Sequence, residues 1–210
     1  MIPFYREPTR EITGSFTAVE AELISSLATQ VAGLLGEVAS RSDDPELAGT
    51  GIGGSTDRHD DPAIARLLPN AYSGDDDASR EFRQLTERGL ASRKIDNAVI
   101  VLHSLEKIAA EAHVTPSVAD DANAATVPDD ASALFEAYQD DAGTEIALDD
   151  PTAIAWLRTL TDIRLTIAAR LGIESDDDTV DDTDDAALVL ADVYNWLGLI
   201  TESLVEAVDS

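Results

Sequence analysis

The sequence predicts a mainly α-helical protein that folds as one domain over residues 1–210, as a bundle of about five or six helices. In several long segments, apolar residues recur at three- and four-residue spacing, which is the pattern of helices with one buried face. Gly, Pro and runs of Asp separate those segments. Hydrophobic residues make up 44% of the 210-residue chain, which is enough for one core.

The N-terminal part of the sequence is predicted to form one long helix, preceded by a segment that fits two kinds of structure. Ile2–Tyr5 and Glu11–Phe16 fit either a small pair of strands or a frayed arm, because their β-propensity is modest. Thr17 followed by Glu20 is a capping-box pattern, and helical spacing then predicts a helix over about 17–41. The apolar residues of its stripe are Val19, Leu23, Leu27, Val31, Leu34 and Val38.

Two helices are predicted in the middle of the chain. Asp61 can cap a short helix whose first residue is Pro62, where the missing N–H costs nothing, and Pro69 ends it. The apolar pattern then restarts and predicts one long helix over about 79–112, with Gly89 as the place for a bend.

The C-terminal third predicts two long helices and two shorter elements. Ala131–Gln139 fits a short helix, and the alternation over Thr144–Leu148 fits a strand. The next helix begins at Pro151 and ends at Gly172. The last helix, over about 183–208, is apolar around much of its circumference, so we expect it at the centre of the bundle or in a homodimer. The residues expected on the inner face of the penultimate helix are Ile154, Leu157, Thr161, Leu165, Ala168 and Leu171.

Three polar segments are predicted to be flexible loops, over about 42–60, 117–130 and 174–183. The first contains the stretch GTGIGGST, but no Lys follows it and its flanks are acidic, so a phosphate-binding loop is the poorer interpretation. The acidic runs lack the alternating ligands, turn glycine and closing glutamate of a calcium loop, and we interpret them as solvated surface.

The composition excludes several classes of function. Forty-two acidic and fourteen basic residues give a net charge of −28, which repels phosphate backbones and anionic lipids, so direct nucleic-acid binding is not expected. The chain has no cysteine and therefore no disulfide, thiolate metal site or sulfur redox switch. Since it shows no signal-peptide pattern and no unbroken apolar run of ~20 residues, we expect a cytoplasmic protein outside the membrane.

No arrangement typical of catalysis or metal binding stands out, so we predict a non-enzymatic protein without a cofactor. The sequence has no Gly-x-Ser-x-Gly motif and no thiol nucleophile. His59, His103 and His113 are its histidines, and no two of them are three or four residues apart. We expect His59 in an exposed loop.

The most interesting polar residues are Arg158, Asp162 and Arg164. Arg158 and Asp162 are four residues apart and can pair along one edge of a helix, while Arg164 lies closer to the apolar seam. We interpret the three as a structural ion-pair network. The alternative is a cleft in which they bind a small ligand or an enzyme's substrate.

Two further groups are candidate interfaces. The basic residues concentrated in one stretch are Arg80, Arg83, Arg88, Arg93 and Lys94. They fit a docking helix for an acidic partner or ion pairs with the chain's own carboxylates, and the second is favoured; a DNA contact is a third hypothesis, which the net charge opposes. Trp196 is expected in the core, but it and Leu199 become dimer or partner anchors if they lie outside it.

Four blocks carry a family resemblance: DPAIARLLPNAY at 61–72, EFRQLTE at 81–87, WLRTLTDIRL at 156–165 and YNWLGLITESLV at 194–205. With these blocks, over nearly the whole chain, the sequence resembles an actinobacterial family of unknown function that includes the oxidative-stress regulator AosR and is often encoded near the proteolytic adaptor ClpS. The resemblance implies a helical fold and a regulatory partner of a stress sigma factor or of the proteolytic machinery.

The chain departs from that family in one respect. The resemblance implies a regulator that senses oxidation through a nearby pair of cysteines, and this sequence has no cysteine. Either this member regulates without sensing, or the redox role is confined to some relatives.

Overall fold

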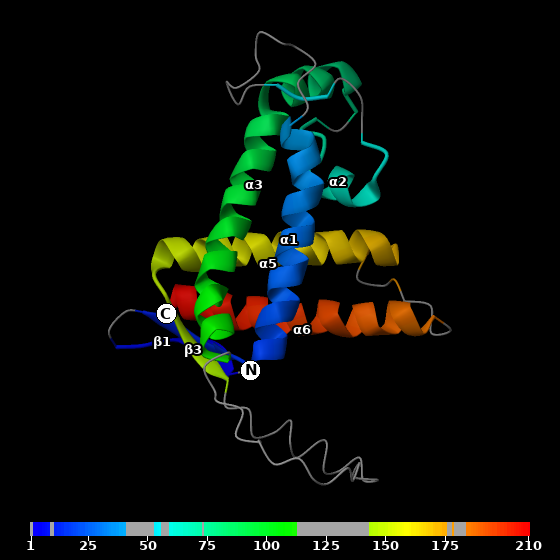
Figure 1. Cartoon of the computed structure of the whole chain (residues 1–210). Helices are drawn as coiled ribbons and strands as arrows, with labels where there is room; N and C mark the ends of the chain where they lie inside the picture. Colours follow the sequence, from blue (N-terminus) through cyan, green and yellow to red (C-terminus); the bar gives the residue numbers. More distant parts are fainter. Residues whose placement is uncertain are drawn as a thin grey trace, which may run out of the picture.

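The structure, a computed structural model, describes residues 2–8, 11–40, 53–55, 59–72, 74–112, 143–175, 178 and 184–210. Within these residues the chain forms five helices and one sheet of three strands (Figure 1). In chain order the elements are β1 (Ile2–Arg6), β2 (Ile12–Phe16), α1 (Ala18–Ser40), α2 (Pro62–Leu67), α3 (Asp76–Ala112), β3 (Thr144–Leu148), α5 (Asp150–Leu171) and α6 (Asp185–Asp209). The predicted mainly α-helical fold with a small β element is confirmed.

Two antiparallel pairs of helices cross each other (Figure 1). α1 and α3 run side by side, and α5 and α6 run side by side across them. α2 packs against α5, and the sheet lies where α5 begins and α6 ends. α3 changes direction between its teal first part and its green remainder, in the region where Gly89 predicts a bend. α5 is therefore the helix that contacts α1, α2, α3 and α6.

The N-terminal segments form strands and not a frayed arm, because β2 is the middle strand of a sheet in the order β1-β2-β3. Both pairings are antiparallel, and β2 aligns Ile12 with Leu148 of β3. All five residues of β2 are buried. Gly14 in this strand leaves room for the ring of Phe4, because a Cβ there would lie 2.7 Å from the ring.

Three aromatic side chains from separate elements form the centre of the core. The rings of Phe16 and Trp156 stack with centroids 5.6 Å apart, and Phe4 meets them edge-on at 5.6 and 5.7 Å. Trp156 is fully buried, and its indole Nε1–H donates to Ser104 Oγ of α3 at 2.8 Å. This bond satisfies the ring's one polar group, and the three rings join the sheet to α5.

The helix ends follow signals in the sequence. In the predicted capping box, Glu20 N–H donates to Thr17 Oγ1 at 3.2 Å and Thr17 N–H donates to the Glu20 carboxylate at 2.9 Å. Asp61 caps α2, and Asp149 caps α5, by accepting hydrogen bonds from backbone N–H groups. Gly172 follows α5 in the left-handed conformation, with φ of 70°.

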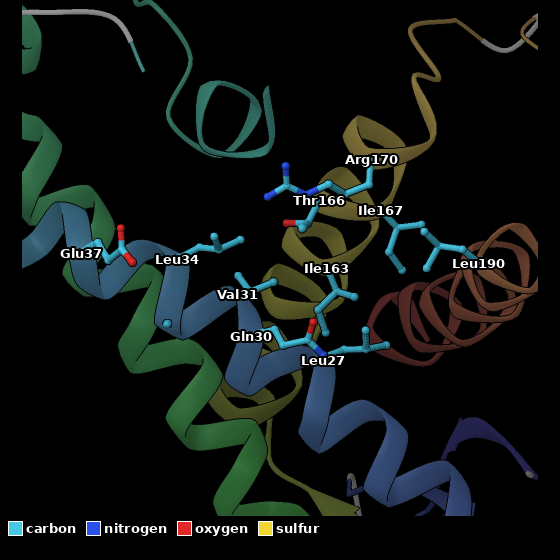
Figure 2. Close-up of a pocket in the computed structure, with 11 residues that line it drawn as sticks. Leu27, Gln30, Val31, Leu34, Glu37, Ile163, Thr166, Ile167, Arg170 and Leu190 are labelled. Carbon is cyan, nitrogen blue, oxygen red and sulfur yellow. The ribbon is translucent and has the colours of Figure 1, made fainter. Parts of the chain in front are cut away.

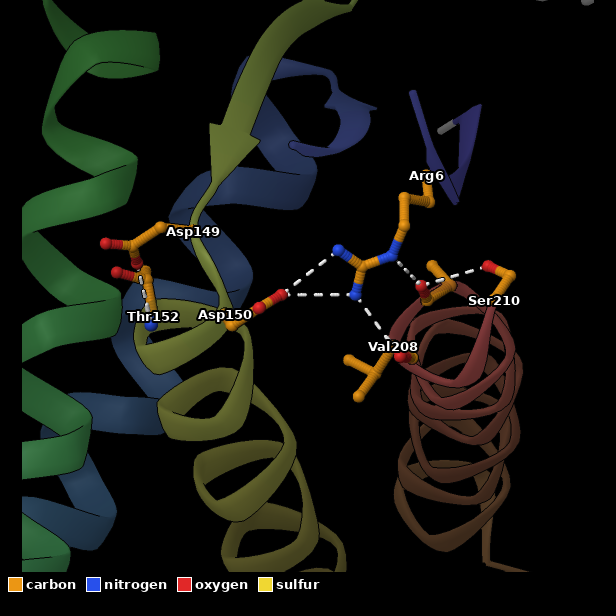
Figure 3. A network of polar contacts seen from close by, with 7 residues as sticks. Arg6, Asp149, Asp150, Thr152, Val208 and Ser210 are labelled. Atoms are coloured by element: carbon orange, nitrogen blue, oxygen red, sulfur yellow. Dashed lines mark hydrogen bonds and ion pairs between the residues drawn. The ribbon is translucent and has the colours of Figure 1, made fainter. Parts of the chain in front are cut away.

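Arg6 of β1 joins the sheet to the facing ends of α5 and α6 (Figure 3). Its Nη1 and Nη2 groups donate to Asp150 Oδ1, both at 3.1 Å. Its Nε–H donates to the Ala207 carbonyl at 2.9 Å, and Nη2 also donates to the Val208 carbonyl at 3.2 Å. Because a cation is favourable beside the last carbonyls of a helix, Arg6 stabilises the C-terminal end of α6.

The predicted inner face of α5 is wrong in detail. Ile154 is 40% exposed and Thr161 is exposed, whereas Leu160 and Ile163 are buried. Of the predicted set, Ala168 is buried, and Leu157, Leu165 and Leu171 are half-buried against the core. A helical stripe identifies one buried face, but α5 has neighbours on several sides and buries more than one stripe.

Several predicted segments lie outside the described residues, namely the helix over 131–139, the loop over 117–130, and most of the loops over 42–60 and 174–183.

Gly53, Gly54 and Ser55 of the first predicted loop are described, and they pack against α3. The backbone N–H of Ser55 donates to the Glu87 carboxylate at 2.8 Å. A Cβ on Gly54 would lie 2.1 Å from the carbonyl oxygen of Arg83, so only glycine fits this close approach. For these three residues the glycine-rich sequence therefore serves packing.

α1 and α6 are each long and apolar enough to cross a membrane, judged by length and composition alone. Core helices of other proteins meet the same test, and both of these helices contribute apolar residues to the common core. Acidic residues such as Glu22 and Asp192 interrupt both apolar stretches.

Candidate protein-docking groove

An apolar groove of about 450 Å³, which we call the α1–α5 groove, lies between α1 and α5 and is bordered by α6 (Figure 2). Its lining residues are Leu27, Gln30, Val31, Gly33, Leu34, Glu37, Ile163, Thr166, Ile167, Arg170 and Leu190.

Helical spacing builds the floor and one rim of the groove. Val31 of α1 and Ile163 and Ile167 of α5 are almost fully buried and form the floor. Leu27 and Leu34 are half-buried and form the α1 rim, since they lie four residues before and three residues after Val31. Because α1 and α5 cross, the side chains that border the groove diverge on either side of this buried floor.

One end of the groove is polar. Glu37 and Arg170 lie there, and the Arg170 guanidinium pairs with Asp61 Oδ2 of the α2 cap at 2.7 Å. Burial acts to raise the pKa of Asp61, but the hydrogen bonds from Arg170 and from the backbone N–H of Ala63 outweigh it and hold that pKa below its usual value. The positive charge of Arg170 is therefore balanced by a partner within the chain.

The lining of the groove provides apolar surface for binding and no group arranged for catalysis among the described residues. Its hydroxyl group, on Thr166, donates to the Asp162 carbonyl at 2.9 Å. Among the residues that the structure describes, no group of three or more His, Asp or Glu side chains could hold a metal ion. What this lining can do is bury apolar side chains of a partner.

The structure does not bring Arg158, Asp162 and Arg164 together as one network. Asp162 is buried between α5 and α3, and its carboxylate accepts a hydrogen bond from Lys94 Nζ at 2.5 Å. Burial raises the pKa of Asp162, and the pairing with Lys94 partly opposes this. Arg158 is exposed, while Arg164 lies over the ring of Tyr194, with Cζ 4.7 Å from the ring centroid. A contact between elements thus replaces the Arg158–Asp162 pair that spacing predicts.

The five basic residues of α3 do not form one exposed face. Arg83 and Arg88 are nearly buried and donate hydrogen bonds within the protein. Arg80 and Lys94 each pair with a carboxylate of this chain, at 2.7 and 2.5 Å. Arg93 donates to a backbone carbonyl of α3 at 3.2 Å. These contacts favour internal ion pairs over a docking helix.

Trp196 and Leu199 differ in their surroundings on α6. Trp196 is half-buried and packs against the core. Leu199 is 62% exposed, so it is free to contact another molecule.

The histidines are dispersed. His59 is nearly buried and not in an exposed loop, with Nε2 2.9 Å from Glu87 Oε1. His103 lies beside Glu106 on an exposed part of α3 at 3.2 Å, and His113 lies outside the described residues.

The sequence pattern identifies the α1 side of the groove as a packing stripe but misses the groove, and it leaves Ile163 and Ile167 outside the predicted inner face of α5. It places Leu27, Val31 and Leu34 on one stripe of the first helix, and the structure buries Val31 while Leu27 and Leu34 are half-buried. The width of the stripe is the signal that could have indicated a second, open face.

Comparisons with known proteins find relatives along nearly the whole chain. A family model described as a domain of unknown function, DUF2017, matches residues 1–208. The putative oxidative stress regulator AosR of Mycobacterium leprae is 30% identical over 190 residues, which cover 90% of this chain and 78% of that protein. The oxidative stress regulators AosR of Mycobacterium bovis and Mycobacterium tuberculosis are each 29% identical over 188 residues, which cover 89% of this chain and 77% of theirs. No solved structure matches the chain.

Proposed function

This chain belongs to the DUF2017 family, and from that premise we propose that it is a regulatory protein that acts in the cytoplasm by binding another protein, without catalysing a reaction. The binding surface is the α1–α5 groove, and the occupant is an amphipathic helix of the partner with basic residues beside its apolar face. The observation that carries this proposal is the apolar α1–α5 groove, in which the half-buried Leu27 and Leu34 border the buried floor of Val31, Ile163 and Ile167.

The lining and the charge of the protein select this occupant. A floor of aliphatic side chains between crossing helices favours Leu-like anchors at three- and four-residue spacing, which a helix presents on one face. The net charge of −28 attracts a basic partner at long range and repels nucleic acid. The acidic side chain of Glu37 at the end of the groove acts in the same direction.

The names of the relatives support a role in regulation. The Mycobacterium proteins are named oxidative stress regulators. We propose the same general role for this chain, with a stress sigma factor or a component of the proteolytic machinery as the partner. Because the chain has no cysteine, it has no thiol of its own with which to sense oxidation.

Differential capture tests the proposal. The full chain is immobilised and exposed to the cytoplasm of its native host, and the retained proteins are quantified for the wild type and for Leu34→Gln. We expect the wild type to retain a protein of transcription or proteolysis. When the helical segment of that protein is titrated, we expect it to bind Leu34→Gln ~10-fold to 100-fold more weakly than the wild type, since a buried Leu contributes about 1.5–3 kcal/mol.

Two matched substitutions locate the surface. Val19→Gln changes an exposed apolar residue of α1 outside the groove and should retain the partner. Leu199→Gln tests the other candidate surface, on α6. Equal capture by the wild type and Leu34→Gln would refute the groove, and loss with Leu199→Gln alone would move the contact to α6.

A further inference from the structure

We propose that a second site, the pocket between Arg66 of α2 and Arg164 of α5, binds a small oxyanion such as phosphate or a carboxylate. The pocket has a volume of about 190 Å³ and lies where α2, α5, α6 and the segment after α5 meet. Its lining residues are Arg66, Thr161, Arg164, Leu165, Ala168, Ile173, Glu174, Ser175 and Tyr194. It is separate from the α1–α5 groove, and the inference does not depend on the proposed docking function.

Arg164 is positioned by packing and not by a carboxylate. Its guanidinium lies over the ring of Tyr194, 4.7 Å from the centroid. Gly198 of α6 lies beside the guanidinium, and a Cβ there would lie 3.5 Å from Nη2, which is an ordinary van der Waals distance. The Nε–H is buried and makes no hydrogen bond with the described residues. The donors that remain for a planar or tetrahedral oxyanion are the Nη groups, which donate to no residue in the described part of the chain.

Arg66 contributes the second positive charge. Its Nη2 donates to the carbonyl of Ile173, which fixes the side chain beside the pocket. Backbone N–H groups of Glu174 and Ser175, at 2.6 and 2.7 Å, hold the pKa of Asp178 below its usual value, with a smaller contribution from the charge of Arg66. The Asp178 carboxylate is thus engaged by the backbone.

The charge balance distinguishes these two arginines from four other basic residues of the chain. Arg6, Arg80, Lys94 and Arg170 each lie within 3.1 Å of a carboxylate of the chain. Neither Arg66 nor Arg164 has a carboxylate at ion-pair distance among the residues that the structure describes. In a chain of net charge −28, two arginines that line one pocket without such partners form a local positive site.

The size and the lining of the pocket restrict the ligand. A volume of about 190 Å³ is below the ~300–1,000 Å³ of pockets that hold drug-sized molecules, so the pocket suits a small anion and not a nucleotide. The hydroxyl groups of Ser175 and Tyr194 supply further donors, whereas the Thr161 hydroxyl already donates to the Leu157 carbonyl at 2.7 Å. Glu174 is the acidic residue of the lining, and it is exposed.

Thermal unfolding and calorimetric titration of the full chain test this site. Sodium phosphate and sodium acetate are added at constant ionic strength with sodium chloride, so that general screening of the acidic protein does not change. We expect phosphate, acetate or both to raise Tm in a saturable way, because a ligand of the folded state stabilises it by mass action. A response to one anion alone assigns the site to a tetrahedral or a planar group.

Arg164→Gln and Arg66→Gln should each weaken the binding ~10-fold to 100-fold, the value of a charged hydrogen bond. Arg164→Lys retains the charge but loses the planar set of guanidinium donors, so it should bind the anion more weakly than the wild type does. Arg158→Gln, an equal change of charge at an exposed position of α5, should bind as the wild type does. Circular dichroism confirms that each variant is folded. The absence of a saturable response in the wild type, or equal binding by Arg164→Gln, would overturn the proposal.

Discussion

Asp162 lies in the interface between α5 and α3, and its exposed fraction is 3%. Burial raises the pKa of its carboxyl, and the hydrogen bond from Lys94 limits the rise. A buried ion pair between two helices costs desolvation energy, so its value is the specific pairing of Lys94 on α3 with one position on α5. The residue serves the orientation of these helices and not an exposed cleft.

The raised pKa predicts a particular dependence of stability on pH. Between the ordinary pKa of 3.8 and the raised value, the folded state binds more protons than the unfolded state, so ionisation of Asp162 lowers stability as the pH rises. The Asp162→Asn variant has no titratable side chain at this position. Its free energy of unfolding relative to the wild type should therefore increase with pH through that window, by about 1.4 kcal/mol for each pH unit between the two pKa values.

Urea unfolding at several pH values above and below 3.8 measures this difference. Asp96→Asn removes one charge from an exposed position of α3 and should not reproduce the increase. If the free energies of unfolding of Asp162→Asn and the wild type differ by a constant amount across this pH range, the pKa of Asp162 is not raised in the folded state.

At the scale of elements, α3 is held at its first part by a segment without regular structure. Gly53, Gly54 and Ser55 lie against it, and the Glu87 carboxylate accepts a hydrogen bond from Ser55 N–H and lies 2.9 Å from His59 Nε2. The glycines here allow close approach of two backbones, whereas glycines within a helix only weaken it.

Two Gly→Ala substitutions separate these roles. In Gly54→Ala the new Cβ would overlap the backbone of α3, so we expect destabilisation of about 1–3 kcal/mol. In Gly36→Ala the Cβ meets nothing within 4 Å in the middle of α1, so we expect stabilisation of about 0.5–1 kcal/mol. Chemical denaturation of both variants measures the sign; a stabilising Gly54→Ala would show that the segment does not pack on α3.

At the scale of the whole molecule, charge dominates the surface. The net charge of −28 favours solubility and disfavours self-association, yet α6 exposes apolar residues including Leu188, Val189 and Leu199. Glu202 lies one turn after Leu199 and is exposed as well. A homodimer through this face brings acidic side chains together, so its affinity should rise with salt.

Light scattering tests the homodimer, which stays a prediction. We expect a mass near twice the 22.3 kDa of one chain, more completely so at high salt. Leu199→Asp should shift the mass toward the monomer, while Val19→Asp, an exposed apolar position on α1, should not. A wild-type mass of 22.3 kDa at every salt concentration would exclude the dimer.

Local signals in the sequence determined most of the secondary structure. Signals at helix ends act on backbone groups within a few residues, so they can be recognised without knowing the fold. Examples are the Thr17–Glu20 capping box, Asp61 before Pro62, and Gly172 after α5. The mainly α-helical class follows from apolar spacing in the same way, because periodicity is a property of one element.

Only the tertiary structure decided which faces are covered and which side chains meet. Asp162 bonds Lys94 across 68 positions of the chain, and α5 buries more than one stripe because it contacts four other helices. The α1–α5 groove and the Arg66–Arg164 pocket likewise join residues of separate helices. Spacing along a chain reports the geometry within an element, whereas burial and pairing depend on distances between elements, which arise only when the helices cross.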